Sequence, residues 1–324
     1  MDEPSTSEHF APTDDGWQLH LTRTFVPARL DRARRPVIIV PGYGMNGFIF
    51  GFHPAGTSMV LHLARAGVEV WVANLRHQGK SRPVSPEAPC PSLRRYAETD
   101  LRAAIATVLA ETETRADRVD VVGASLGGSI AYAHLALEPR HRIGSLVAIG
   151  SPLRWVDVPP LLRVSFRSAR LAGLVRVRNT RRLASYVLPI ATRAPALLSL
   201  YLNAANVDLR AAPRMIETVE DPHPRVNADI AKWLAASDMV LRGVNVTEAL
   251  SSCRVPLFIV LANRDGIVPP RTALSARDAW GGRDVAVLSV GDARHWYAHA
   301  DLFVGREAPS RVFAPIADWL AERS

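Results

Sequence analysis

The chain has 324 residues, of which 48% are hydrophobic and 22% charged, and its formal net charge is +8. This size and composition suit a soluble protein built as one large α/β domain that carries an insertion. They exclude a membrane-spanning helix, because no stretch approaches the roughly 18–20 uninterrupted apolar residues that a span needs. The positive charge is almost all arginine, since Lys80 and Lys232 are the only lysines. No DNA- or RNA-binding signature accompanies it, so we expect no nucleic-acid partner.

The start of the chain and its cysteines bear on the cellular compartment. Residues 1–10 are acidic and polar and lack the apolar segment of a secretory signal. The two cysteines, Cys90 and Cys253, lie far apart in the sequence, and in a chain without an export signal we expect them to be reduced thiols. We therefore expect a cytoplasmic protein.

The predicted elements begin at residues 17–26, whose alternating pattern indicates an antiparallel pair at one edge of a sheet. Six continuous apolar runs follow, and runs of this kind are typical of strands buried on both faces of a parallel sheet. The runs are 36–40, 68–75, 118–125, 145–150, 256–262 and 284–290, and helical periodicity appears at 57–66, 93–112, 128–138 and 271–280. Residues 310–324 predict a closing helix with Val312, Phe313, Ile316, Trp319 and Leu320 on one face. The pattern predicts an α/β fold with a mostly parallel, doubly wound sheet.

Residues 152–250 interrupt this alternation. They contain no clear strand, only helical segments punctuated by prolines. We therefore expect a helical cap, or lid, inserted between two strands over the carboxyl edge of the sheet, where open α/β folds keep their sites. The core then consists of residues 1–151 and 251–324.

The first part of this cap is both apolar and basic. Residues 153–182 hold eight arginines against one acid, Asp157, and Arg163, Arg167 and Arg170 recur at helical spacing. One interpretation is a lid that admits an apolar acyl group and makes weak contact with an anionic lipid surface. The other is a cap helix with one solvated, positive face and one packed face.

The strongest chemical motif is Gly123-Ala124-Ser125-Leu126-Gly127, at the junction of a predicted strand and a predicted helix. Such a G-x-S-x-G turn is so tight that only glycine fits two positions before and after the serine. The serine hydroxyl is then exposed above the sheet as a nucleophile. The backbone N–H of Leu126, at the helix N-terminus, is one oxyanion donor. The alternative is an ordinary strand-to-helix turn with a hydrogen-bonded serine.

With this turn in that context, the sequence resembles the serine hydrolases of the α/β-hydrolase superfamily over essentially its whole length apart from the cap. The loop NLRHQGKS resembles the family's D-x-R-G-x-G-x-S loop, from which Asn74 and His77 depart. The loop VPGYGMNGF resembles the family's H-G-x-G oxyanion loop, with Pro41 where histidine is more common. The resemblance implies the α/β-hydrolase fold and gives the second oxyanion donor as the backbone N–H of Tyr43. Because this donor belongs to the main chain, Pro41 does not by itself remove it.

Asp265 lies just past an apolar run and is followed by GIVP. This resembles the family's strand-end acid with its D-x-x-V-P sequence, so the resemblance implies that Asp265 orients and stabilises a histidine base. A second interpretation is that Asp265 caps the helix that begins near Pro270. A few family members carry the acid after the preceding strand, and Asp157 is the weaker candidate for that position.

Two histidines, His295 and His299, follow the last predicted strand, where the order serine, acid, histidine requires the base. From His299 onward, HADLFVGREAPSRVF resembles the C-terminal segment of the acid lipases, in which the histidine of an H-x-D motif is the base. The resemblance therefore implies that His299 is the base and Asp301 the aspartate of that motif. His295 is then a loop histidine or lines the site. We expect no metal on this pair, since the glutamate of H-E-x-x-H and a third ligand are missing.

These residues predict a serine hydrolase that cleaves a small carboxylic ester with a hydrophobic acyl or alkyl group. The triad is Ser125, His299 and Asp265, the reaction passes through an acyl-enzyme, and no metal or organic cofactor is needed. An acyltransferase is one alternative, because polyester synthases share the fold, although they carry cysteine where serine stands here. A non-catalytic binding protein of the same fold is the other. The sequence leaves the oligomeric state and the physiological substrate open.

Overall fold

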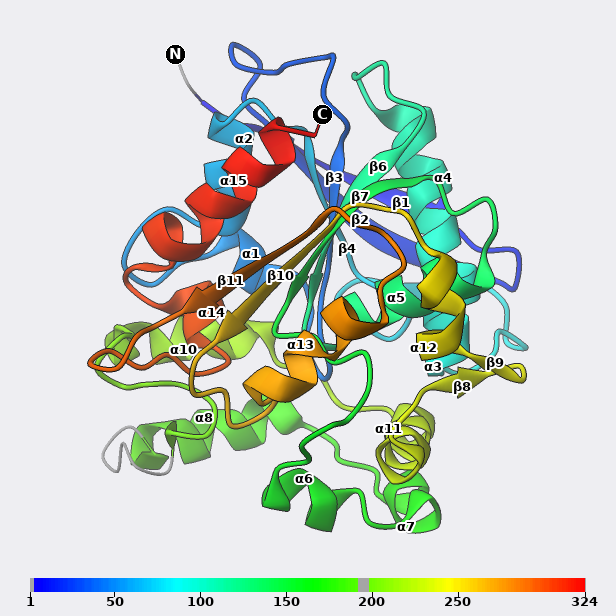
Figure 1. Ribbon diagram of the computed structural model, residues 1–324, viewed down its shortest axis with the longest axis vertical. Coiled ribbons are helices and arrows are strands. Elements are labelled where there is room, and N and C mark those ends of the chain that lie inside the picture. Colours follow the sequence, from blue (N-terminus) through cyan, green and yellow to red (C-terminus); the bar gives the residue numbers. More distant parts are fainter. Residues whose placement is uncertain (1–2, 192–197, 324) are drawn as a thin grey trace.

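The computed structural model describes residues 3–191 and 198–323 (Figure 1). Its centre is a mixed sheet in which eight strands lie in the order β1-β2-β4-β3-β6-β7-β10-β11, and β5 pairs with β2 beside this path. The strands are β1 (Ser5–Pro12), β2 (Trp17–Phe25), β3 (Val37–Val40), β4 (Val70–Ala73), β5 (Arg82–Pro83), β6 (Val119–Ala124), β7 (Ile143–Ile149), β10 (Leu257–Ala262) and β11 (Val285–Val290). The pairs β1–β2 and β2–β4 are antiparallel, and every later pair along the path is parallel.

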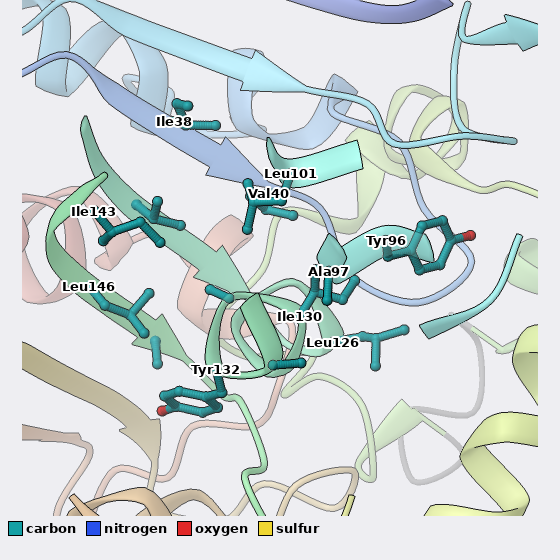
Figure 2. Packing of buried hydrophobic residues seen from close by; sticks show 14 of the residues in the cluster. Ile38, Val40, Tyr96, Ala97, Leu101, Leu126, Ile130, Tyr132, Ile143 and Leu146 are labelled. Carbon is teal, nitrogen blue, oxygen red and sulfur yellow. The ribbon is translucent and has the colours of Figure 1, made fainter. Parts of the chain in front are cut away.

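Buried strand residues alternate between the two faces of the sheet. In β3, Ile38 and Val40 belong to one hydrophobic cluster. Val37 and Ile39 belong to the other. Figure 2 shows the first cluster, in which side chains of β3 and β7 gather around the helix that follows β6. Because both faces of these strands are apolar, both must be covered by helices.

Helices cover the two faces accordingly (Figure 1). The face of Ile38 and Val40 is covered by α3 (Leu93–Arg95), the π-helical turn η1 (Tyr96–Asp100), α4 (Leu101–Glu111), α5 (Leu126–Leu137), α12 (Val246–Ala249), the 3₁₀ turn η4 (Leu250–Ser252) and α13 (Pro270–Ala279). The other face is covered by α1 (Phe48–Gly51), α2 (Met59–Arg65), α14 (Asp301–Val304), the π-helical turn η5 (Pro309–Phe313) and α15 (Ala314–Ala321). The predicted doubly wound α/β fold is confirmed.

Most predicted elements of the core are present, with corrections at the edges of the sheet. The closing helix is confirmed, since all five of its predicted apolar residues are buried. The run 284–290 was expected to be buried on both faces, and this is wrong. It forms the edge strand β11, in which Val287 is 41% exposed. The antiparallel pair expected at the opposite edge around residues 17–26 is confirmed as β1–β2, although the bounds of β1 and the two-residue β5 were not predicted.

Between β7 and β10 the chain forms an insertion made mostly of short helices. They are α6 (Pro160–Ser165), α7 (Ala169–Leu174), α8 (Thr180–Ala191), η2 (Leu209–Ala211), α10 (Ala212–Met215), η3 (Ile216–Thr218) and α11 (Pro224–Ala236). The expectation of no strand here is wrong in one detail, because β8 (Val240–Leu241) and β9 (Val244–Asn245) form a small hairpin. Two-residue strands are too short to produce a visible alternation.

The first three helices of the insertion, α6, α7 and α8, lie at the end of the molecule opposite to the chain termini (Figure 1). The end of the insertion is different, because Val246 of α12 and Leu250 are fully buried in the cluster around α5. Among the helices that the structure describes, none combines the length and the apolar character needed to cross a bilayer.

Candidate active site

Ser125 occupies the sharp turn between β6 and α5. Its backbone angles are φ 53° and ψ −119°, a conformation that residues with a side chain adopt only under strain. The main chain holds it there. The Ser125 N–H donates to the carbonyl of Ile149 at 2.8 Å, and the Ser125 carbonyl accepts from the N–H of Gly128 at 3.1 Å. The residue is only half-buried, although its neighbours on both sides are buried.

The glycines of the motif are required by close backbone contacts. A Cβ atom built on Gly123 would lie 2.3 Å from Cα of Gly128. A Cβ atom on Gly127 would lie 2.2 Å from the carbonyl oxygen of Val40. The obstructing atoms are backbone atoms of α5 and β3, so they cannot rotate away. The tight approach of α5 to the sheet therefore depends on these glycines.

His299 and Asp265 form a buried pair at the same edge of the sheet. Nδ1 of His299 lies 2.6 Å from Oδ2 of Asp265. The other carboxylate oxygen, Oδ1, accepts hydrogen bonds from the backbone N–H groups of Ile267 and Val268, each at 2.8 Å. The interpretation of Asp265 as a helix cap is therefore wrong, since the N-cap of α13 is Pro269. The turn after β10 fixes the carboxylate and leaves one oxygen for the imidazole.

The end of β7 connects this pair to Ser125. Gly150, the residue after β7, has φ +55°, and a Cβ atom built on it would lie 2.9 Å from Cε1 and 3.1 Å from Nδ1 of His299. The imidazole of His299 therefore packs on the Cα of Gly150. The preceding residue, Ile149, accepts the hydrogen bond that holds Ser125. Within the described residues, the Ser125 hydroxyl forms no hydrogen bond.

The loop after β3 lies against the serine. A Cβ atom on Gly42 would lie 3.1 Å from Cβ of Ser125. In the next residue, the hydroxyl of Tyr43 donates to Oδ1 of Asn227 at 2.6 Å, and its ring lies edge-on to Phe166 with centroids 6.2 Å apart. Desolvation of this hydroxyl raises the pKa of Tyr43 to about 12. The insertion thus holds the side chain of Tyr43, while its main chain runs beside the serine.

A second buried carboxylate, Asp301, supports the loop that carries His299. It is fully buried and accepts hydrogen bonds from the backbone N–H groups of Ala298 at 2.8 Å and Asn203 at 3.0 Å, and from the side-chain amide of Asn206 at 3.2 Å. Burial raises the pKa of Asp301 to about 6. Asp301 ties Ala298, the residue before His299, to Asn203 of the insertion. The H-x-D motif indicates this aspartate, but nothing in the sequence indicates its partners.

The loop after β4 is held by a buried ion pair that the sequence did not lead us to predict. Nε of Arg76 donates to Oδ1 of Asp100 at 2.8 Å, and both side chains are fully buried. Arg76 also donates to Asp15 at 3.0 Å. Desolvation raises the pKa of Asp100 to about 6 even beside the arginine. Further along the loop, the amide of Gln78 donates to the carbonyl of Gly42 at 3.4 Å, so this loop supports the one beside Ser125.

The two departures from the family's loop pattern have different consequences. His77, at the position of the usual glycine, keeps a left-handed backbone with φ 67°. This conformation costs a residue with a side chain roughly 1–2 kcal/mol. Oδ1 of Asn74 accepts the N–H of Gly47 at 2.8 Å, and its amide nitrogen lies 3.1 Å from Nδ1 of His20. Asn74 therefore joins the loops that follow β3 and β4.

Two other candidates from the sequence lie away from this cluster. The imidazole of His295 is exposed, with Nδ1 3.5 Å from Asp292, and its segment is not helical, so the four-residue spacing does not align it with His299. Asp157 pairs with Arg271 at 3.1 Å on the surface. Within the described residues, no group of three or more His, Cys, Asp or Glu side chains is arranged to hold a metal ion.

A doubly wound sheet with a strained serine after one strand and a histidine–aspartate pair after two later strands is the arrangement of an α/β hydrolase. Residues 35–299 match the family model described as the alpha/beta hydrolase fold, and the chain belongs to this family. Comparison with curated proteins finds no match.

Three solved structures illustrate the likeness of the fold. A thermophilic esterase from Thermogutta terrifontis is 18% identical, covers 98% of this chain and 100% of its own, and has a TM-score of 0.63. An esterase from Rhodococcus sp. ECU1013 is 17% identical, with coverage of 98% and 100% and a TM-score of 0.63. The monoacylglycerol lipase of Paleococcus ferrophilus is 15% identical, with coverage of 94% and 99% and a TM-score of 0.62. At these identities the likeness concerns the fold.

Proposed function

We propose that this α/β hydrolase cleaves carboxylic esters that carry a hydrophobic acyl or alkyl group. The observation that carries the proposal is the convergence of Ser125, on its strained turn, with the His299–Asp265 pair at the end of the neighbouring strand. Proteins of known structure with the same fold include two named as esterases and one named as a monoacylglycerol lipase. Our proposal assigns the same kind of activity to this chain.

In the proposed reaction, Oγ of Ser125 attacks the acyl carbonyl while Nε2 of His299 takes its proton. The 2.6 Å contact of Nδ1 with Asp265 supports this role, because it keeps the proton on Nδ1, leaves Nε2 as the acceptor and stabilises the imidazolium. The imidazolium then gives its proton to the departing alcohol. Water releases the acid along the same path. The serine hydroxyl forms no hydrogen bond with any residue that the structure describes, and such contacts often form only in the substrate complex.

Two backbone N–H groups are proposed to stabilise the oxyanion. Leu126 is the first residue of α5, so its N–H has no acceptor within the helix. The N–H of Tyr43 follows Gly42, which lies against Ser125. In a comparable enzyme the loss of one such donor raises the barrier by roughly 3–4 kcal/mol. The support from Asn74 and Gln78 keeps this loop in place before substrate arrives.

The insertion is proposed to select hydrophobic substrates. A cavity of about 20 Å³ beside Tyr43 has room for a single water molecule at most. Its lining is mixed, with apolar Met45, Leu126 and Val226 beside polar Gln78, Glu220, Asp221 and His223. A longer acyl or alkyl group that uses this side of the site therefore requires the segment around Val226 to move. Esters whose hydrophobic group is short are expected to react with the smallest rearrangement.

A fluorophosphonate probe tests the nucleophile directly. We expect the wild-type protein to be labelled and Ser125→Ala to remain unlabelled, while Ser129→Ala, in the first turn of α5, keeps its label. Labelling of Ser125→Ala would overturn the assignment of the nucleophile. A panel of p-nitrophenyl esters of increasing acyl length then tests hydrolysis and reports the size of the acyl pocket. A protein that is labelled but releases no p-nitrophenol without an added alcohol or thiol would be an acyltransferase instead.

A further inference from the structure

The positive charge of the chain is concentrated in one part of the insertion. Residues 158–207 contain eight arginines, no lysine and no aspartate or glutamate. The whole chain has 39 basic and 31 acidic residues, so removing these eight leaves 31 of each. The rest of the protein is therefore formally neutral, and fifty residues hold the entire net charge of +8.

Most of these arginines face solvent without an acidic partner. Arg181 pairs with Glu220 at 3.3 Å. Over the part of the chain that the structure describes, the exposed arginines without a salt bridge are Arg163, Arg167, Arg170, Arg176, Arg178 and Arg182. The guanidinium of Arg163 donates to the carbonyl of Val158 at 3.5 Å, which leaves its charge without an acidic partner among the described residues. These arginines remain available to an external anion, and a guanidinium binds phosphate oxygens in a bidentate way.

Large apolar side chains are exposed among the same arginines. Of the fifteen exposed large hydrophobic residues that the structure describes, nine fall between residues 158 and 207. Those of the first three helices and their connections are Leu161, Val164, Leu171, Leu174, Val175, Leu183 and Tyr186, each 51% to 76% exposed. Figure 1 shows α6, α7 and α8 together at one end of the molecule. Exposed apolar groups gathered in one region are a sign of an interaction surface.

We propose that this arginine-rich cap surface, formed by α6, α7, α8 and their connections, docks on a membrane surface that contains anionic phospholipids. Arginines attracted to phosphate head groups, together with aliphatic side chains that enter the boundary of the acyl region, are the two elements of interfacial binding. The surface goes beyond the proposed function, because its binding does not depend on the reactivity of Ser125. Docking brings the end of the molecule that covers the carboxyl edge of the sheet towards the lipid.

Two other occupants fit the surface less well. A second copy of the chain would bring the same positive charge against itself, and the repulsion opposes association. A nucleic acid matches the charge, but single-stranded recognition uses aromatic side chains for stacking. Of the nine exposed large hydrophobic residues between 158 and 207, all are aliphatic except Tyr186 and Tyr201. Charge and side-chain type together favour the lipid surface.

Sedimentation with vesicles tests the proposal on the full-length protein. We expect binding to vesicles of phosphatidylcholine mixed with phosphatidylglycerol to be at least about tenfold tighter than binding to phosphatidylcholine alone. High salt should weaken it, since the attraction is screened. Equal binding to both kinds of vesicle, or no binding to either, would overturn the proposal. Binding to DNA but not to vesicles would overturn it in favour of a nucleic-acid surface.

A matched pair of variants distinguishes the effect of the cap arginines on vesicle binding from the effect of the overall net charge. We expect the triple substitution Arg163→Glu, Arg167→Glu and Arg170→Glu to reduce vesicle binding at least about tenfold. The control, Arg115→Glu, Arg118→Glu and Arg140→Glu, changes the net charge by the same amount at exposed positions near the amino ends of β6 and β7. It should bind within about twofold of the wild type, because these positions lie far from α6 to α8. An equal loss in both triples would contradict a defined surface.

Two further variants test the apolar contribution and the independence from catalysis. Leu171→Ser with Leu174→Ser should remove the part of vesicle binding that survives high salt, with melting temperature unchanged, because both side chains are exposed. If the salt-resistant part persists, the aliphatic groups do not enter the lipid and the proposal is wrong on that point. Ser125→Ala should bind vesicles like the wild type. Loss of esterase activity in that variant with retained binding separates the two proposals.

Discussion

The carboxyl edge of the sheet and the arginine-rich cap surface use charge in opposite ways. At the sheet edge, Arg76 is fully buried against Asp100, and the carboxylates of Asp265 and Asp301 each accept several hydrogen bonds. On the cap, Arg167 and Arg170 are exposed and have no acidic partner in the described part of the chain. In the first region charged groups fix the loops around the strained turn at Ser125. In the second they contribute little to the fold, which leaves them for recognition.

This difference predicts where substitutions act. A buried ion whose partner is removed remains in a medium that solvates it poorly, so the effect on stability is large. An exposed arginine stays hydrated after a neighbour changes, so the effect is small. The same distinction separates the two histidines near the C-terminus, because one is buried on a carboxylate and the other is exposed.

The largest expected effect concerns these histidines. His299→Ala should lower kcat on a p-nitrophenyl ester by about three to five orders of magnitude, because the serine loses its proton acceptor. His295→Ala is the control, and its kcat should stay within about threefold of the wild type, because its side chain is exposed and pairs with Asp292 at the surface. The reverse ranking would show that the buried imidazole is structural and the exposed one reacts.

The next largest effect is on stability. Arg76→Ala should lower the free energy of unfolding by about 3–5 kcal/mol, since it leaves the buried carboxylate of Asp100 without its cation. Arg167→Ala, an equal truncation on the cap, should change it by less than about 0.5 kcal/mol. Urea unfolding of both variants gives the comparison. Similar losses in the two variants would mean that the cap arginine has an intramolecular role.

Asp301 offers a test by pH. Burial raises its pKa to about 6 from an ordinary value of 3.8. The folded protein therefore binds this proton more tightly than the unfolded chain, and the resulting stabilisation is complete below about pH 4 and lost as the pH rises through 6. Asp301→Asn lacks this titration, so its melting temperature should move towards that of the wild type between pH 4 and 7. A constant difference between the two would show that Asp301 keeps its ordinary pKa.

At neutral pH the same variant reports on positioning. Asparagine places an amide nitrogen opposite the N–H of Asn203 or of Ala298, so one hydrogen bond to the loop is lost. We expect kcat to fall about tenfold while KM changes little, because the base shifts but the substrate pocket does not. A change in KM alone would place the effect in the insertion.

The smallest effect is a gain. His77→Gly should raise the free energy of unfolding by about 0.5–1 kcal/mol, because relief of the left-handed strain exceeds the greater entropy of glycine in the unfolded chain. Asn179, which also has a positive φ of 59° but lies in the insertion, is the matched position for Asn179→Gly. Its gain should be smaller, since asparagine tolerates this conformation. A loss at His77 would mean that its ring packing on His223 matters more than the backbone.

Much of the core was predictable because its strands are buried on both faces and therefore read as continuous apolar runs. The edges were not. The alternation of residues 17–26 indicates an antiparallel pair, but β1 itself consists largely of exposed polar residues, so nothing in the sequence marks its bounds. β11 is apolar in sequence, but the sequence does not show that this strand lies at the edge of the sheet. At that edge Val287 is partly exposed.

For the candidate site, sequence motifs predicted the residues themselves, but the contacts that hold them in place appear only in the structure. The turn at Ser125 is visible in the sequence because two glycines are sterically required there. The partners of Asp301 lie in the insertion, and the partner of Arg76 lies in the π-helical turn after the loop. Such pairs join segments with no fixed spacing. A single sequence therefore contains no signal for them.

The contact between Gly150 and His299 has a consequence for engineering this fold. Position 150 neither reacts nor offers a side chain, yet a single added methyl group would collide with the imidazole and would also have to adopt a φ of +55°. In a saturation library this position should tolerate almost no replacement, although a screen for substrate contacts would overlook it. The position of the proposed proton acceptor therefore depends on the missing side chain at Gly150, and any redesign of that strand end must keep glycine there.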